Sequence, residues 1–150
     1  MIDIASVGHV RDALGRELAV SDWLEVAQTR IDQFADATDD HQWIHVDPAR
    51  AADSPFQTTI AHGFLTLSLI STLLRSAVKV SAARMAINYG VNRVRFVSAV
   101  TAGTRIRGRF TPIAVDQKDD GFQVTWAATI ERERGDRPAC VAEWIVRYYM

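Results

Sequence analysis

The sequence predicts an α+β fold in which a curved antiparallel β-sheet wraps around one long buried helix. Two patterns indicate this fold: a nearly continuous apolar segment that begins at Gly63, and alternating apolar and polar residues from Met85 to the C-terminus. The length of 150 residues is sufficient for one hydrophobic core. We therefore expect a single domain over residues 1–150.

The apolar segment predicts the central helix. Apart from Arg75, the polar residues between Gly63 and Val78 are all Ser or Thr, and the apolar side chains are Phe64, Leu65, Leu67, Leu69, Ile70, Leu73, Leu74 and Val78. A helix that is apolar on nearly every side is buried in the protein. The stretch is too short to cross a bilayer, so the rest of the chain must surround it.

The alternating segments predict the sheet that surrounds this helix. Period-two alternation with short connections is typical of antiparallel strands with one packed face. Turn residues lie at Asp119-Asp120-Gly121 and at Gly135-Asp136. The predicted strands cover residues 85–89, 92–96, 104–110, 122–130 and 140–148. A curved antiparallel sheet around one buried helix is the hotdog fold.

Shorter elements are expected before the central helix. Residues 21–26 suit a first strand. Thr29 resembles a helix N-cap with Asp32 three positions later, and this helix should end near Thr38. Asp47-Pro48 begins a second, short helix, which residues 54–56 end.

Composition restricts the partners and the compartment. Lys and Arg number 17 against 18 Asp and Glu, so the overall basic field typical of nucleic-acid binding is absent. Cys140 is the only cysteine, which excludes an intrachain disulfide and fits a reducing compartment. The first 20 residues contain no apolar run of signal-peptide length. We expect a soluble cytoplasmic protein with no nucleic-acid or membrane partner.

The densest polar cluster lies just before the apolar segment. Phe34 is followed by Thr38-Asp39-Asp40-His41-Gln42-Trp43-Ile44-His45, and Ala61-His62-Gly63 opens the central helix. This pattern resembles the signature of the MaoC-like dehydratases, or (R)-specific enoyl-CoA hydratases: an aromatic residue, then Ser/Thr-Gly-Asp-x-Asn-Pro-Ile/Leu-His, then Ala-His-Gly. Residues 87–96 also look like the short, single-domain NodN-like branch. The resemblance extends from Ser21 to the C-terminus.

The resemblance implies a function and site residues. Asp40 corresponds to the catalytic Asp and His45 to the catalytic His, while the backbone N–H of Gly63 faces the thioester oxygen. Ser71 matches a helix hydroxyl near the site of some members. The implied activity is reversible hydration of trans-2-enoyl thioesters to (R)-3-hydroxyacyl thioesters in fatty acid metabolism, without metal or cofactor. The substrate carrier is coenzyme A or acyl carrier protein, and the implied assembly is a homodimer.

Three positions depart from the family pattern. Asp39 replaces Gly, Gln42 replaces Asn and Trp43 replaces Pro. A glycine before the catalytic Asp often permits a positive φ, and Asp tolerates that conformation better than most residues. These departures concern the shape of the loop and the fit of the substrate more than the Asp40/His45 pair.

The chemistry of the residues agrees with the resemblance. Hydration needs a base for water, an acid for the α-carbon and a stabiliser for the enolate oxygen. Asp40 and His45 can converge on one water across a turn, and either can activate it. Gly63 at a helix N-terminus offers a free N–H, and a donor of this kind is typically worth ~3 kcal/mol at a developing oxyanion.

Other interpretations of the same residues stay open at this point. The acidic residues can be caps and His45 a satisfied buried histidine, and His41, His45 and Asp47 can be read as metal ligands. A hotdog thioesterase and a non-catalytic acyl-thioester binding module are the alternative functions. One strand face carries three arginines that are either solvated or bind phosphate: Arg105, Arg107 and Arg109.

Overall fold

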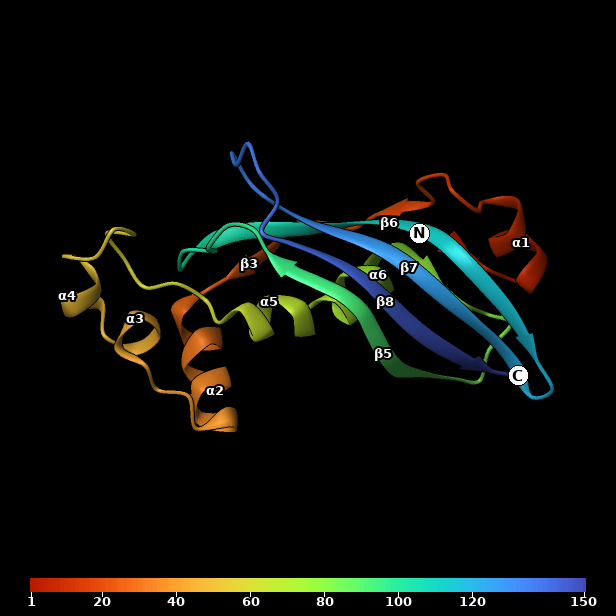
Figure 1. Cartoon of the computed structure of the whole chain (residues 1–150), viewed down its shortest axis with the longest axis horizontal. Helices are drawn as coiled ribbons and strands as arrows, with labels where there is room; N and C mark the ends of the chain where they lie inside the picture. The colour runs from red at the N-terminus through yellow and green to blue at the C-terminus, as the bar shows by residue number, and fades with distance from the viewer.

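The computed structural model describes residues 1–150 and consists of a long, curved antiparallel sheet with a helix along its concave face (Figure 1). The strand order is β2-β6-β7-β8-β5, and β3 also pairs with β6. The expected α+β hotdog architecture is confirmed. The strands of this sheet are β2 (Ala19–Val20), β3 (Leu24–Val26), β5 (Met85–Phe96), β6 (Thr104–Lys118), β7 (Gly121–Arg132) and β8 (Cys140–Tyr149).

The four long strands extend further than their alternation predicts. β5 is continuous through the two predicted segments, and β6 runs eight residues beyond Phe110 to Lys118. The alternation fades there because the ladder between β6 and β7 shifts register between Pro112 and Ala114. A proline inside a strand is tolerated at such an irregularity.

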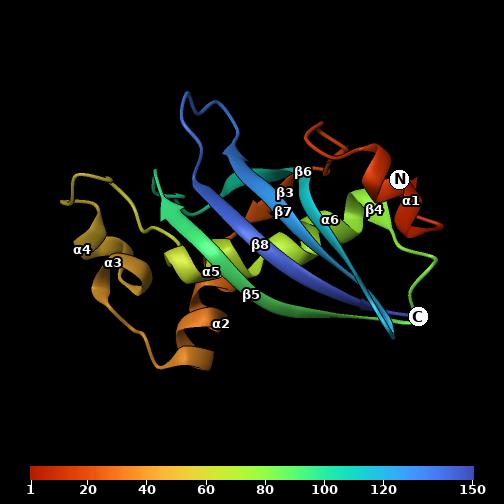
Figure 2. The same ribbon diagram turned by 45° about the vertical axis from the view of Figure 1, so that its right-hand side comes forward.

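The central helix is formed by α5 (Gly63–Ser68) and α6 (Ile70–Ala77). Leu69 joins them in helical conformation, because its N–H donates to Leu65 O and its carbonyl accepts from Leu73 N–H. Figure 2 shows this helix under the sheet, beneath β5 and β8. Its apolar face enters a cluster of 27 buried residues that includes side chains from every long strand except β5. Phe64 departs from the prediction, since it is 68% exposed.

The elements before the helix differ from the sequence-based expectation in detail. The predicted strand 21–26 is shorter, because Ser21 leaves the strand and its Oγ accepts a hydrogen bond from Gly108 N–H. Helix α2 (Gln28–Thr38) ends where expected, but its N-cap is Ala27. The predicted capping box was therefore wrong, since Thr29 lies inside the first turn.

The short helix after Asp47 is confirmed, and other short elements were not expected. Helix α4 (Pro48–Ala51) is capped by the Asp47 carboxylate, which accepts from Arg50 N–H at 3.0 Å, and it ends before residues 54–56. None of the helices has the length and hydropathy needed to cross a bilayer. The unexpected elements are β1 (Ile2–Asp3), α1 (Val7–Asp12), β2, α3 (Trp43–Val46) and β4 (Val78–Lys79), of which β1 and β4 pair in parallel.

The three arginines of β6 are ion-paired along the sheet. Arg105 binds Glu133, Arg107 binds Glu131, and Arg109 binds both Glu17 and Glu131. Each guanidinium thus already has a carboxylate partner. This supports the interpretation as a solvated sheet face over the phosphate-binding one.

We predict that Gly108→Ala destabilises the fold by about 1–3 kcal/mol, because overpacking a core costs this much. A Cβ at Gly108 would lie 2.6 Å from the Phe110 ring and 3.3 Å from Leu73 Cβ, so Gly108 permits the close approach of helix and sheet. The measurement is the free energy of unfolding in urea. Gly90→Ala is the matched control, since no atom lies within 4 Å of its added Cβ, and equal unfolding energies for the two variants would contradict the prediction.

Candidate active site

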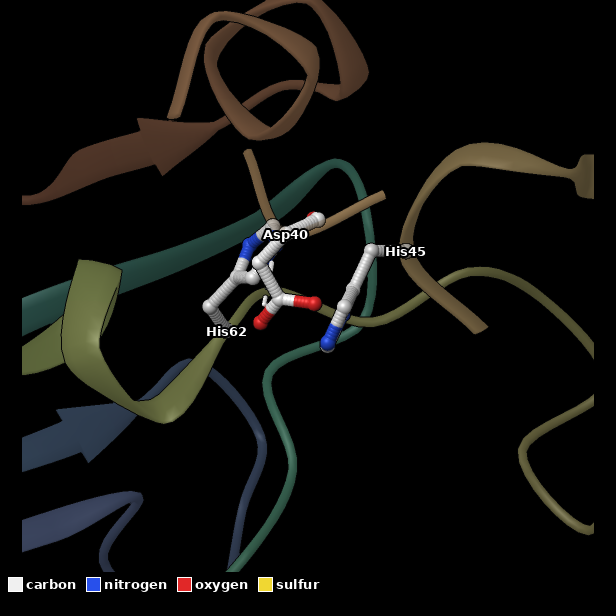
Figure 3. Close-up of side chains that lie close together, drawn as sticks. All are labelled: Asp40, His45 and His62. Carbon is white, nitrogen blue, oxygen red and sulfur yellow. Dashed lines mark hydrogen bonds and ion pairs between the residues drawn. The ribbon is translucent and has the colours of Figure 1, made fainter. Parts of the chain in front are cut away.

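The end of helix α2 places Asp40 in the site. Asp39 adopts a left-handed conformation, with φ 58° and ψ 20°, and Asp40 N–H donates to Ala35 O at 3.1 Å. The expected positive φ at the position of the family glycine is therefore confirmed. The turn directs Asp40 toward the two histidines (Figure 3), with its side chain 55% exposed.

His45 lies on α3 and is only 7% exposed. Its Nδ1 lies 2.6 Å from the carbonyl oxygen of Ile60, so Nδ1 carries the hydrogen and Nε2 has a free lone pair when the ring is neutral. Burial lowers the pKa of His45, although its hydrogen bond to Ile60 opposes this effect. At neutral pH, His45 therefore presents an acceptor to the site.

His62 completes the cluster and is 3% exposed. Its Nε2 lies 2.9 Å from the backbone oxygen of Asp40 and 3.9 Å from the carboxylate Oδ2 of the same residue. The His62 ring stacks on the His45 ring with centroids 3.7 Å apart and planes inclined by 24°. Polar side-chain atoms of Asp40, His45 and His62 all lie within 4.8 Å of one another.

The cluster contains ligand atoms suited to a metal ion, but the stacked rings are poorly oriented for one. A ring-nitrogen lone pair lies in the plane of its ring. The two ring centroids are 3.7 Å apart and the planes are inclined by only 24°, so one ion at the ~2 Å distance of a zinc–nitrogen bond cannot lie near both planes. The alternative ligand set that includes His41 and Asp47 is wrong. His41 Nε2 instead contacts Asp36 at 2.8 Å, and Asp47 caps α4.

Gly63 begins the central helix directly after His62. Its N–H donates no hydrogen bond within the chain, as expected for the first residue of a helix. A Cβ at this position would lie 2.7 Å from the ring of Phe96 on β5. Glycine thus allows the helix start to approach β5 and leaves a donor beside the three polar side chains.

Ser71 lies away from this cluster. It follows Gly63 by eight residues, which corresponds to ~12 Å along a helix, and its Oγ donates to Ser68 O at 3.4 Å. Ser71 instead lines a cavity of about 550 Å³ between α6 and strands β5 and β8, with Leu74, Trp144 and Tyr148. The structure therefore places Ser71 in an apolar groove and not beside Asp40 and His45.

Gln28 holds the site and was not identified from the sequence. Its Nε2 donates to His45 O and to Asp32 Oδ1, both at 2.8 Å, and its Oε1 accepts from the Thr59 hydroxyl. One amide thus connects α2, α3 and the segment before the central helix. Gln28 precedes His45 by 17 residues, and no local motif marks it.

Comparison with known proteins agrees with the resemblance seen in the sequence. Residues 9–133 match a family model described as a MaoC like domain. The chain belongs to the MaoC-like dehydratase family.

Two relatives and one solved structure show how similar this MaoC-like protein is to known proteins. It is 48% identical over 144 residues to 3-hydroxyacyl-thioester dehydratase Z of Mycobacterium tuberculosis, covering 95% of each chain. It is 50% identical over 143 residues to nodulation protein N of Rhizobium leguminosarum, covering 93% of this chain and 89% of the relative. The (R)-hydratase from A. caviae superposes with a TM-score of 0.73 at 24% identity, over 88% of this chain and 95% of that one, which shows the shared fold.

We predict that His45 makes the stability of this MaoC-like protein fall on acidification. Because the folded pKa is lowered, the unfolded chain binds a proton below about pH 6.5 that the folded chain does not, so unfolding becomes more favourable as the pH falls. His45→Gln removes this contribution. Wild type should therefore lose stability relative to the variant between about pH 7.5 and about pH 5.5.

The measurement is urea unfolding of wild type and His45→Gln across this pH range. The pKa of His41 is raised by its bond to Asp36, but His41 is present in both proteins and its contribution cancels in the difference. Parallel stability curves for the two proteins would contradict the prediction.

Proposed function

We propose that this MaoC-like protein is a hydro-lyase that interconverts trans-2-enoyl thioesters and (R)-3-hydroxyacyl thioesters. The observation that carries the proposal is the pair of acceptors beside a free donor: neutral His45 Nε2 and the Asp40 carboxylate, next to the N–H of Gly63. The 48% identity to a 3-hydroxyacyl-thioester dehydratase supports the same reaction.

The geometry suits activation of one water. A water molecule has two hydrogens to donate, and His45 Nε2 and the Asp40 carboxylate each accept one, which leaves an oxygen lone pair for carbon 3 of the enoyl group. As the C3–O bond forms, one water proton passes to an acceptor of the pair and then to carbon 2. The N–H of Gly63 stabilises the negative charge on the thioester oxygen meanwhile. Dehydration is the reverse sequence.

The apolar groove along α6 suits the acyl chain. The cavity that contains Ser71 adjoins a smaller one of about 260 Å³, since both are lined by Ser71, Asn88 and Trp144. This path follows the central helix away from the helix start at Gly63. An acyl chain with its thioester at Gly63 can lie along it, and the thioester carrier, coenzyme A or acyl carrier protein, then extends toward solvent.

The two alternative functions differ from hydration in the products. A thioesterase releases a free thiol, whereas a hydratase removes the conjugated double bond and leaves the thioester intact. A non-catalytic module binds the thioester and changes neither its double bond nor its thioester bond. Asp40 and His45 lie in one cluster with His62, which Gly63 directly follows, despite the departures at Asp39, Gln42 and Trp43; this favours the hydratase.

We also propose that the protein is a homodimer joined through β5. This strand is an edge of the sheet, bonded only to β8, and it is 12 residues long. Its exposed side chains include Ile87, Val91 and Tyr89, the last 68% exposed. A long apolar edge strand left open invites pairing with another chain, so a second copy is the expected partner.

We predict that Asp40→Asn and His45→Gln each lower kcat/KM by about 100- to 10,000-fold, because each removes a group that transfers or positions the proton of water. The measurement is loss of the ultraviolet band of a short trans-2-enoyl-CoA, with a thiol reagent in a parallel cuvette. His41→Gln and Asp36→Asn are matched controls, because these residues bind each other outside the cluster. Wild-type rates in either Asp40→Asn or His45→Gln would exclude that residue from the mechanism.

The cysteine of the protein itself does not contribute to the thiol signal. Cys140 is buried, and burial raises the pKa of its thiol to about 11. A thiol signal then comes from the substrate carrier and would indicate thioesterase activity. The buried, unreactive thiol also fits the reducing, cytoplasmic location that we propose for this chain.

We predict a particle of twice the chain mass of 16.7 kDa in light scattering at micromolar concentration. Val91→Lys should shift this particle toward the monomer, because a charge on the edge strand opposes strand pairing. Ile113→Lys is the control, since Ile113 is an equally exposed apolar residue on β6. A wild-type protein that is monomeric at this concentration would refute the dimer.

A further inference from the structure

His62 transfers no proton in the proposed reaction, yet it contacts both Asp40 and His45, which are the proton acceptors. Its ring stacks on His45, and its Nε2 reaches the main chain of Asp40. Phe34 lies against the ring as well, with centroids 5.0 Å apart. The buried imidazole therefore has fixed neighbours on its faces and on Nε2.

We propose that His62 is a positioning residue for the hydration reaction, holding Asp40 by its backbone carbonyl and His45 by its ring face so that both acceptors reach one water. This inference rests on the proposed function. Figure 3 shows the three side chains close together, with the carboxylate of Asp40 beside the two histidines.

The hydrogen-bond partners of His62 indicate which tautomer of its imidazole holds Asp40 and His45 in place. A carbonyl oxygen only accepts, so the 2.9 Å contact to Asp40 O requires a hydrogen on Nε2. Nδ1 of His62 is buried and has no hydrogen-bond partner. A proton added there would be buried without an acceptor, which is costly. The neutral Nε2–H tautomer is thus the form that this site accommodates.

A neutral His62 also suits the chemistry of His45. The titratable groups that face His62 are Asp40, from the loop after α2, and His45, from α3. Burial is the largest cause that lowers the pKa of His45, and the neutral ring of His62 stacked on one face contributes to that burial. His62 therefore supports the base form of His45 as well as its orientation.

His62 further connects two segments that are distant in the sequence. Asp40 and His45 precede the central helix, whereas His62 is the N-cap residue of α5 and is bonded covalently to Gly63. The contact between His62 and Asp40 spans 22 residues. One side chain thus sets the water-binding pair relative to the Gly63 N–H.

Two substitutions of His62 distinguish the role of its Nε2–H donor from the role of its stacked ring. His62→Gln places an amide N–H near the position of Nε2 and keeps the donor without the stacked ring, whereas His62→Phe keeps a ring face without the donor. We expect His62→Phe to lower kcat by about 100-fold with KM changed less than about threefold, since a misplacement of 1 Å in a catalytic group costs this much. His62→Gln should recover about tenfold of that loss.

His41→Phe, which replaces an exposed histidine of the same loop, is the control for both variants and should leave kcat and KM unchanged. Folded His62→Phe and His62→Gln proteins with wild-type kcat would overturn the inference.

A measurement on the wild-type protein tests the inference even if the His62 variants do not fold. ¹⁵N NMR of histidine-labelled protein at neutral pH should show His62 as the Nε2–H tautomer and His45 as the Nδ1–H tautomer, with the His62 assignment made by elimination using His9, His41 and His45 variants. A His62 imidazolium or Nδ1–H form would overturn the inference. Absence of hydration in wild type would instead overturn the proposed function, and the tautomers would still be measurable.

Discussion

The burial of the central helix in the concave face of the sheet is the packing interaction on which the rest of the structure depends. Leu65, Leu69, Leu73 and other apolar residues of the helix share one cluster with the inward side chains of β6, β7 and β8. Burial of this apolar surface is the main favourable contribution to folding. It also fixes the helix start, because Gly63 lies against Phe96 of β5 with no room for a side chain.

The site is built where that fixed helix start meets the irregular segment before it. Three hydrogen bonds to main-chain oxygens hold the polar residues: His45 to Ile60, His62 to Asp40, and Gln28 to His45. Each uses a donor whose hydrogen is then no longer available, so each also determines the tautomer or orientation of its side chain. The result is a pair of stacked imidazoles, with the Nε2 lone pair of His45 free, beside a carboxylate that is exposed to solvent.

The edge strand β5 differs from the core strands because its apolar side chains are exposed. β5 carries exposed apolar side chains along its whole length, and the groove that contains Ser71 lies between this strand and α6. A partner chain on β5 would therefore cover the edge and lie beside the groove at the same time. In the proposed dimer, chain association and substrate binding would both depend on this strand.

The sequence by itself determined the fold class, and its resemblance to the MaoC-like signature indicated Asp40, His45 and Gly63 as candidate site residues. Alternation with period two, an all-apolar helix and the spacing of Asp40, His45 and Gly63 are local or short-range patterns, so they are readable without coordinates. The positive φ of Asp39 was expected because Asp39 stands where the family pattern has glycine. The ends of the strands and the N-cap of α2 did not, because hydrogen bonds from neighbouring strands and residues decide them.

Only the tertiary structure decided how the site is held together. It separated His41 and Asp47 from His45, moved Ser71 into the groove, and showed Gln28 and His62 in contact with the catalytic candidates. These relations join residues that lie up to 22 positions apart. Their distances depend on how α2, α3 and the central helix pack, and packing of that kind leaves no periodic signal in the sequence.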